Sequence, residues 1–337
     1  MINYCTQVEI PASPFKIQYK DRILFIGSCF ADHIGSRMSA YGFQAEVNPF
    51  GVLYNPLSVA SACRRMLNPE PFTEADLFLH EGLYHSLAHH GRFSDRSAES
   101  CLSGINESLS CAAEWLRTSS YFVITFGTTY VYRHKKTGMT AANCHKLPAS
   151  DFVRECLTVD AIAGEWSALL EDLWHVNPSL KIICTVSPIR HWKDGAHPNQ
   201  ISKATLLLAE QALSERYSGQ VWYFPAYEIM MDELRDYRFY AEDMLHPSSQ
   251  AVDYIWERFS EACMDRETRS FMKEMELIRK NRNHRPFNPD SESYKRFLMQ
   301  TLLKIRQLRG KNPYICLSKE EEEEVEKLLK KFQRTIQ

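Results

Sequence analysis

Residues 23–31 read ILFIGSCFA, a short apolar run that ends in a glycine and is followed by mostly small side chains. Four further short runs, rich in β-branched and aromatic residues, lie at 43–47, 121–126, 182–186 and 221–224. They are continuous rather than alternating, as expected of strands that are covered on both faces. Helical patterns lie between them, near residues 106–117, 160–175 and 202–216. The alternation predicts a three-layer α/β/α fold with a five-stranded parallel sheet.

The remaining segments have a different character. Residues 66–101 lack strong periodicity and are interpreted as an insertion, and residues 130–133 and 139–140 suit a small hairpin. The end of the chain is charged and helical, with a last helix expected to begin at Ser318. We therefore expect two parts, a domain over residues 1–262 and a helical C-terminal extension over residues 263–337.

Composition excludes several classes of protein. The 337 residues are 44% hydrophobic and 24% charged, and 40 Lys and Arg against 42 Asp and Glu give a net charge of −2. This is ordinary globular composition, with no reason to expect nucleic acid or a membrane as a partner. No apolar stretch approaches the ~18 residues of a membrane span, and residues 1–20 do not resemble a signal peptide. The ten cysteines form no CxxC pair, which indicates reduced thiols in a cytoplasmic protein.

The turn after the first strand is a candidate site. Gly27 lets the backbone bend sharply, so that Ser28 and Cys29 lie above the carboxyl edge of the sheet, where open α/β sheets bind ligands. Cys29 would lie at a helix N-terminus, where the helix dipole and free N–H groups favour a thiolate or a developing oxyanion. We expect this position to lower the pKa of the thiol. A structural turn with a buried cysteine is the alternative.

A second candidate element follows the last strand. Asp243 and His246 are three residues apart in the sequence DMLHP, just before a helical pattern over residues 248–259. The aspartate would orient the imidazole, and the histidine would act as general base for a hydroxyl or thiol nucleophile. Two unrelated surface residues are the alternative reading. Combined with the turn at Cys29, the pair suggests a hydrolase.

The chain resembles the GSCFA domain family, a mainly bacterial group placed among the SGNH/GDSL-like hydrolases. The resemblance covers roughly residues 20–260. Its motifs are, in chain order, GSCFA at 27–31, NPFGVLYNP at 48–56, TFGTTYVYR at 125–133, CHK at 144–146, SPIRHW at 187–192, NQISKA at 199–204 and DMLHP at 243–247.

The resemblance implies a catalytic arrangement of the SGNH type. In that pattern a GDS block supplies the nucleophile, a glycine and the asparagine of GxND complete the oxyanion hole, and DxxH supplies the acid and base. Gly51 matches the glycine, Thr129 stands in the asparagine position, and Asp243 and His246 match DxxH. The first block departs from the pattern, because register places Ser28 on its aspartate and Cys29 on its serine. The nucleophile is Cys29 by register, Ser28 if the turn differs by one residue, or neither.

Further polar residues follow the fourth strand. Arg190 and His191 would lie at the same sheet edge, where an arginine either binds a substrate carboxylate or phosphate or forms a structural ion pair. Asn199 and Lys203 open the next helix and either contact the ligand or serve the helix itself. We expect no metal, because the spacing matches no zinc pattern; the residues considered are His85, His89, His90, Cys144 and His145. No glycine-rich phosphate loop or dinucleotide fingerprint is present, so we expect no cofactor.

The favoured function is that of an esterase removing an acyl group from a carbohydrate or another small polar substrate. The nucleophile takes the acyl group, His246 moves the proton and Asp243 orients His246, while N–H groups near Cys29, Gly51 and Thr129 hold the oxyanion. Two alternatives stay open. The same site would serve an acyltransferase, because a thioester reacts readily with amines and alcohols, or the domain binds a ligand without catalysis, since the GDS serine and the GxND asparagine are missing. The sequence predicts no oligomeric state.

Overall fold

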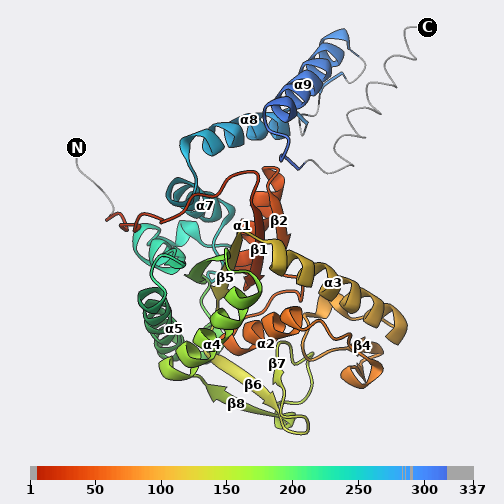
Figure 1. The fold of residues 1–337 in the computed structure, drawn as a ribbon, viewed down its shortest axis with the longest axis vertical. Coiled ribbons are helices and arrows are strands. Elements are labelled where there is room, and N and C mark those ends of the chain that lie inside the picture. Colours follow the sequence, from red (N-terminus) through yellow and green to blue (C-terminus); the bar gives the residue numbers. More distant parts are fainter. Residues whose placement is uncertain (1–5, 283, 285, 289–290, 317–337) are drawn as a thin grey trace. The chain divides into compact units, whose positions relative to one another are not determined.

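The five apolar runs form one parallel sheet (Figure 1) in a computed structural model that describes residues 6–282, 284, 286–288 and 291–316. Its strands are β1 (Arg22–Gly27), β2 (Gln44–Val47), β5 (Tyr121–Phe126), β9 (Lys181–Val186) and β10 (Val221–Tyr223). Their spatial order is β10-β9-β5-β1-β2, which confirms the predicted sheet. Counted along the chain, neighbouring strands run 2-1-3-4-5, the flavodoxin-like order. The order reverses between β1 and β5, where such folds bind ligands.

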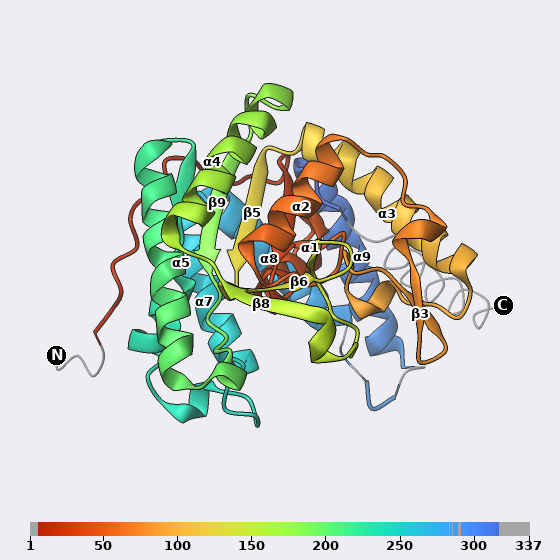
Figure 2. The ribbon, with the colours of Figure 1, turned by 90° about the horizontal axis from the view of Figure 1, so that it is seen from below.

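Helices cover both faces of this sheet. They are α1 (Cys29–Ala40), α2 (Pro56–Leu67), α3 (Ala98–Thr118), α4 (Val159–Val176), α5 (Ala196–Arg216), the single turn α6 (Ala226–Glu228) and α7 (Ser249–Cys263). On one face, Leu24 and Phe122 pack into a core with side chains of α2, α3, α4 and α5; Figure 2 shows α4 and α5 side by side. On the other face, Phe25 lines a small cavity together with Phe30 of α1 and Phe259 of α7. The three-layer prediction is therefore confirmed.

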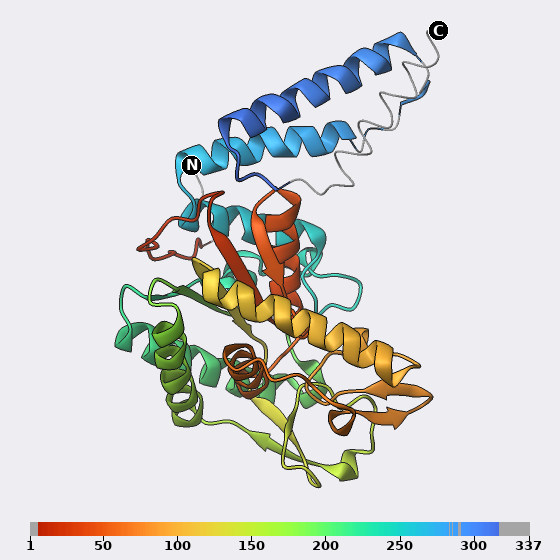
Figure 3. The same ribbon diagram turned by 45° about the vertical axis from the view of Figure 1, so that its right-hand side comes forward.

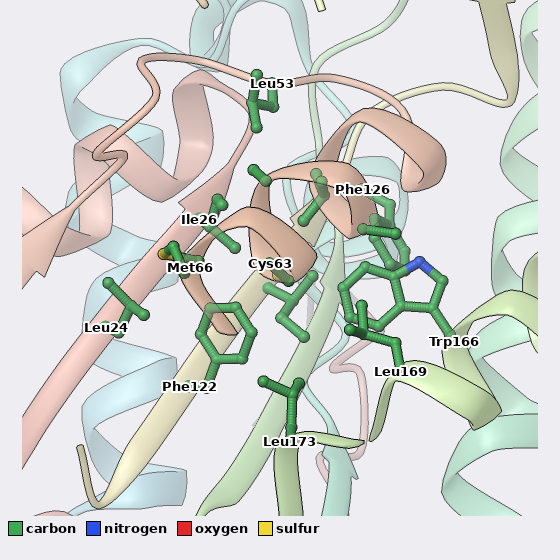
Figure 4. Close-up of a cluster of buried hydrophobic side chains, with 14 of the residues drawn as sticks. Leu24, Ile26, Leu53, Cys63, Met66, Phe122, Phe126, Trp166, Leu169 and Leu173 are labelled. Atoms are coloured by element: carbon green, nitrogen blue, oxygen red, sulfur yellow. The ribbon is translucent and has the colours of Figure 1, made fainter. Parts of the chain in front are cut away.

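The largest fully buried side chain ties two helices of the first face to the sheet. Trp166 of α4 is completely buried, and its ring lies against Phe126 with centroids 5.0 Å apart (Figure 4). Its indole N–H donates to the carbonyl of Pro56, 3.2 Å away, at the first residue of α2. The polar atom of a large apolar side chain is thereby satisfied inside the core.

Two small sheets flank the central one. The predicted hairpin is confirmed as β6 (Tyr130–His134) and β7 (Thr140–Ala141), and β8 (Phe152–Cys156) adds an antiparallel strand that the sequence did not suggest. The segment 66–101 contains the hairpin of β3 (Phe78–His80) and β4 (Leu83–His85), which lies beside the first turns of α3 (Figure 3).

Contacts divide the chain into two compact units. The first comprises Met1–Pro14, Arg22–Ser36 and Ala45–Ala262, and the second comprises Phe15–Asp21, Arg37–Gln44 and Cys263–Gln337. The second unit therefore includes two N-terminal segments that a division at residue 262 assigns to the first. It contains the expected helices, α8 (Arg266–Arg282) and α9 (Glu292–Lys311), whereas the helix expected from Ser318 lies outside the described residues. Among the helices described, none is both long and apolar enough to cross a membrane.

The turn after β1 depends on the absence of a side chain at Gly27. Its φ is +140°, and a Cβ there would lie 2.2 Å from the carbonyl oxygen of Thr125 in β5. Two hydrogen bonds hold the turn: the Gly27 N–H donates to the side-chain Oδ1 of Asn48 at 2.8 Å, and the Gly27 carbonyl accepts from the N–H of Leu53 at 2.8 Å. This arrangement brings the ends of β1 and β5 together and fixes where α1 begins.

Gly27→Ala is expected to lower the free energy of unfolding by about 3 kcal/mol, because it combines an unfavourable φ with a main-chain clash. Gly104→Ala is the matched control, since nothing lies within 4 Å of its Cβ in α3. That change should raise stability by about 0.5–1 kcal/mol. Urea unfolding measures the free energy of unfolding of both variants. If the two substitutions changed it by the same amount and in the same direction, the close approach of residue 27 to the Thr125 carbonyl would be contradicted.

Candidate functional site

A cleft lies at the carboxyl edge of the central sheet. Its volume is about 470 Å³, and its lining includes Cys29, Arg190, His191 and His246. Residues that follow β1 and β9 and residues of the loop before α7 therefore line one cleft, at the sheet edge where a site was expected from the sequence. A larger cavity of about 560 Å³ beside α2 contains none of the expected nucleophiles or bases.

Cys29 is the first residue of α1 and is partly exposed in the cleft. Its sulfur lies 3.7 Å from the hydroxyl of Tyr54. Burial raises the pKa of the thiol above its ordinary value, an effect that the Tyr54 hydrogen bond opposes and the Asp32 carboxylate reinforces. The expectation of a lowered pKa was therefore wrong in direction, because desolvation outweighs the donors at the helix N-terminus.

Ser28 lies beside Cys29 but is only 2% exposed. Its hydroxyl accepts a hydrogen bond from the N–H of Phe30 at 3.3 Å, and its own N–H donates to the Thr125 carbonyl at 3.2 Å. The side chain thus satisfies a free N–H at the start of α1, the role of a helix cap. Of the two nucleophile candidates, Cys29 is the more accessible.

Asp243 and His246 form a hydrogen-bonded pair that is half-exposed. Nδ1 of His246 lies 2.5 Å from Oδ2 of Asp243, while Oδ1 accepts from the N–H groups of Leu245 and His246, both at 2.9 Å. These N–H groups and the imidazole lower the pKa of Asp243 to about 2. Because an ionised carboxylate only accepts, Nδ1 must donate, which leaves Nε2 as the proton acceptor.

Arg190 supports the loop that carries this pair. Its Nη2 donates to the Met244 carbonyl at 2.5 Å, and its guanidinium lies over the rings of Trp192 and Tyr240, 5.2 Å and 4.9 Å from their centroids. Met244 has a φ of +59°, unusual for a residue with a side chain. Arg190 lines the cleft as expected, and the same guanidinium holds the Met244 carbonyl and the two aromatic rings.

His191 faces the cleft from the loop after β9. Its ring meets Tyr54 edge-on, with centroids 5.6 Å apart, and its main-chain N–H donates to Oδ1 of Asn199 at 2.9 Å. Burial, followed by the charges of Lys203 and His246, lowers its pKa to about 4. His191 is therefore neutral at pH 7.

Asn199 and Lys203 are buried behind the cleft and do not line it, so their proposed contact with substrate does not fit the structure. The Lys203 ammonium donates to the carbonyls of Gly127 and Ser187, at 2.8 Å and 2.7 Å, and burial lowers its pKa to about 7. These bonds fix the ends of β5 and β9. The sequence pattern predicted that both residues open a helix, whereas α5 begins earlier, at Ala196, and both side chains are buried.

The two expected oxyanion donors are also engaged elsewhere. The N–H of Gly51 donates to the Asn48 carbonyl at 2.7 Å, and the N–H of Thr129 donates to the hydroxyl of Ser202 at 2.9 Å. Thr129 is fully buried, and its own hydroxyl also bonds Ser202, at 3.0 Å. Neither residue lines the cleft. In this conformation the N–H groups of Gly51 and Thr129 are already hydrogen-bonded and are not free to donate to an oxyanion beside Cys29.

Several cleft residues were not singled out by the sequence. Tyr54 contacts the thiol, and Tyr130, Tyr132 and Trp192 add aromatic surface. Arg154 covers the Tyr130 ring at 3.8 Å and pairs with Asp194. All of these residues except Asp194 and Arg154 lie within the motifs quoted above. An aromatic residue in a motif usually belongs to the core, so the sequence did not distinguish side chains that line the cleft from side chains that pack in the core.

The histidine-rich segment is satisfied by hydrogen bonds. The rings of His85 and His145 lie 4.4 Å apart, with His85 bonded to the Ser94 hydroxyl at 2.6 Å and His145 to the Ser86 carbonyl at 2.8 Å. Nδ1 of His89 lies 3.0 Å from the hydroxyl of Ser86. Within the part of the chain that the structure describes, no three His, Cys, Asp or Glu side chains are grouped to hold a metal ion.

Comparison with known families gives two matches. The model of the GSCFA family matches residues 22–259, which include every residue discussed at the cleft. A model described as the C-terminal domain of GSCFA domain proteins matches residues 275–331. No curated protein matches the chain.

The raised pKa of Cys29 predicts a specific alkylation profile. A thiol that is protonated at pH 7 should react slowly with iodoacetamide at pH 6–7, and its rate should rise about tenfold per pH unit to a higher pH than the rate of an ordinary exposed cysteine. Peptide mapping by mass spectrometry gives the rate at each pH, with the exposed Cys156 as the reference in the same samples. A Cys29 rate that levels off below pH 7 would contradict the effect of burial.

Proposed function

The chain belongs to the GSCFA family, and from that premise we propose an SGNH-like esterase that removes an acyl group from a carbohydrate or another small polar substrate. The observation that carries the proposal is that Cys29 and His246 line the same cleft, and that His246 is hydrogen-bonded to Asp243. A nucleophile, a base and a group that orients the base are the parts that acyl transfer through a covalent intermediate requires.

The proposed reaction has two halves, formation of an acyl thioester on Cys29 and its hydrolysis, and His246 transfers a proton in both. Nε2 of His246 takes the proton of the Cys29 thiol while sulfur attacks the ester carbonyl carbon, and the C=O π pair moves to oxygen. When that pair returns, the C–O bond to the alcohol breaks and His246 gives its proton to the leaving oxygen. Water then attacks the thioester in the same way, which releases the acid and restores the thiol. Asp243 stays ionised throughout, since its pKa is about 2.

The lining of the cleft supports a polar substrate with a ring. Tyr132 and the exposed Trp192 add aromatic surface to the cleft, and Tyr130 and Tyr132 add hydroxyl groups, a combination that suits a sugar's apolar face and its hydroxyls. The flavodoxin-like strand order, with the site beside the first strand, agrees with the SGNH assignment that the motifs suggested. We propose a cytoplasmic location because the nine cysteines that the structure describes are all unpaired thiols.

An acyltransferase is the second candidate, and the cysteine nucleophile is what favours it. A thioester is attacked by amines and alcohols as well as by water, so a suitable acceptor in the cleft would divert the acyl group from hydrolysis. Product analysis with and without added glycerol separates the two, because transfer yields an acylated glycerol. A ligand-binding domain without catalysis would release neither product.

Hydrolysis of p-nitrophenyl acetate and of acetylated sugars tests the nucleophile. Cys29→Ala and His246→Ala should each lower kcat by about a thousandfold or more, because both residues act in every bond-breaking step. Ser28→Ala is the neighbouring control, for which we expect kcat within about tenfold of the wild type and a loss of about 1 kcal/mol of stability from the helix cap.

The opposite ranking would assign the attack to Ser28. If the wild type turned over no acyl ester, and His246→Ala left the alkylation of Cys29 unchanged, the binding-domain alternative would replace the enzyme.

A further inference from the structure

Negative charge on Cys29 needs a hydrogen-bond donor that neither expected residue supplies. The N–H groups of Gly51 and Thr129 already donate to Asn48 and Ser202. A half-buried thiolate, or the oxyanion that follows it, is costly without a donor because burial disfavours the charged form. Besides the N–H of Cys29 itself, which also favours the ionised thiol, a further donor must come from another group beside the sulfur.

The hydroxyl of Tyr54 is placed at that position. It lies 3.7 Å from the Cys29 sulfur, within the longer range of hydrogen bonds to sulfur, and both residues line the cleft. Of the contacts that accompany the Cys29 thiol, this hydrogen bond is the largest that favours its ionised form.

Tyr54 is held by three separate contacts. Its main-chain carbonyl accepts from the N–H groups of Gly127 and Thr128, at 2.7 Å and 3.0 Å, so it is fixed to the end of β5. Its ring meets that of His191 at an angle of 83°. The following residue, Asn55, caps α2 through the N–H of Ser58 at 2.8 Å. With its main chain fixed and its ring against His191, the phenol meets the charge with little reorganisation, the property that makes preorganised donors effective.

The direction of this hydrogen bond follows from the two acidities. Burial raises the pKa of Tyr54 well above its ordinary value, and the nearby thiolate raises it further. When Cys29 ionises, the phenol therefore keeps its proton and donates a hydrogen bond to the sulfur. Burial and Asp32 oppose ionisation of the thiol, whereas Tyr54 favours it.

We propose that Tyr54 is a catalytic residue whose hydroxyl donates a hydrogen bond to the Cys29 sulfur as the thiol gives up its proton to His246. The inference rests on the proposed function, since it assigns a role within that reaction. The proton of Tyr54 stays on its own oxygen throughout. The thiol proton goes to Nε2 of His246, the sulfur lone pair forms the new S–C bond, and the carbonyl π pair moves to oxygen.

Tyr54→Phe tests the role, because it removes the hydroxyl and keeps the ring against His191. We expect the pKa of the Cys29 thiol, read from its iodoacetamide profile, to rise by about one. We expect kcat for p-nitrophenyl acetate to fall by about tenfold to a hundredfold. Tyr217→Phe is the matched control: its hydroxyl bonds Glu171 at 3.0 Å and the Ser167 carbonyl, away from the cleft. This control should leave both values unchanged.

A second replacement strengthens the same hydrogen bond instead of removing it, and it gives a result even if Tyr54→Phe does not fold. 3-Fluorotyrosine at position 54 has a more acidic hydroxyl and is a stronger donor, so the pKa of the Cys29 thiol should fall. Thermal unfolding of every variant verifies that it is folded.

The alkylation measurements need no substrate, so they separate this inference from the proposed function. The inference is overturned if folded Tyr54→Phe and the fluorotyrosine protein both keep the wild-type alkylation profile. It is also overturned if Tyr54→Phe shifts that profile while kcat stays at the wild-type value. If the wild type turns over no acyl ester, but the alkylation profiles of Tyr54→Phe and the fluorotyrosine protein differ from it as expected, the esterase is rejected. Tyr54 then remains the hydrogen-bond donor to the thiolate.

Discussion

The close approach of Gly27 to the carbonyl of Thr125 is the constraint on which the rest of the site depends. A Cβ at residue 27 would lie 2.2 Å from that oxygen, so β1 ends against β5 only if residue 27 is a glycine. The Ser28 N–H then bonds the same carbonyl, and α1 starts at Cys29. The thiol therefore projects from the point where the strand order reverses, the position at which parallel sheets leave room for a ligand.

A polar layer behind the cleft keeps these loops in place. Asn48 accepts from the Gly27 N–H and donates to the Asp32 carboxylate at 2.6 Å, which links the end of β1 to α1. On the other side, Lys203 bridges the carbonyls that follow β5 and β9. Burial lowers the pKa of Lys203 to about 7, so keeping the ammonium charged there opposes folding unless both hydrogen bonds form. Several residues that resemble ligand contacts in the sequence thus serve to hold the loops that line the cleft.

The fold was more readable from the sequence than the details of the site. A continuous apolar run such as residues 121–126 indicates a strand that is covered on both faces, and this pattern can be read from the segment itself. Strand order and β8 were not readable, because they depend on pairing between distant segments. Cys29 could be placed at the cleft because strand ends in a parallel sheet share one edge, and His246 because residues 243–247 resemble the DxxH motif. The errors at Gly51 and Thr129 arose because the direction of an N–H depends on loop dihedrals, and the effect of burial on Cys29 depends on the whole surrounding structure.

The raised pKa of the thiol has a consequence for how the proposed site would work. A cysteine whose pKa lies above its ordinary value rests in the neutral form, so the nucleophile must be generated by proton transfer during attack rather than stored as an ion pair. Asp243 is suited to that scheme, because its pKa of about 2 keeps a carboxylate beside the imidazole, where it stabilises the positive charge that the ring gains on taking the proton. In the proposed reaction, Tyr54 and Asp243 would act at opposite ends of one proton transfer, the phenol on the sulfur that gains negative charge and the carboxylate on the ring that gains positive charge. A protonated thiol reacts slowly with alkylating agents, so this arrangement would also limit side reactions while no substrate is bound.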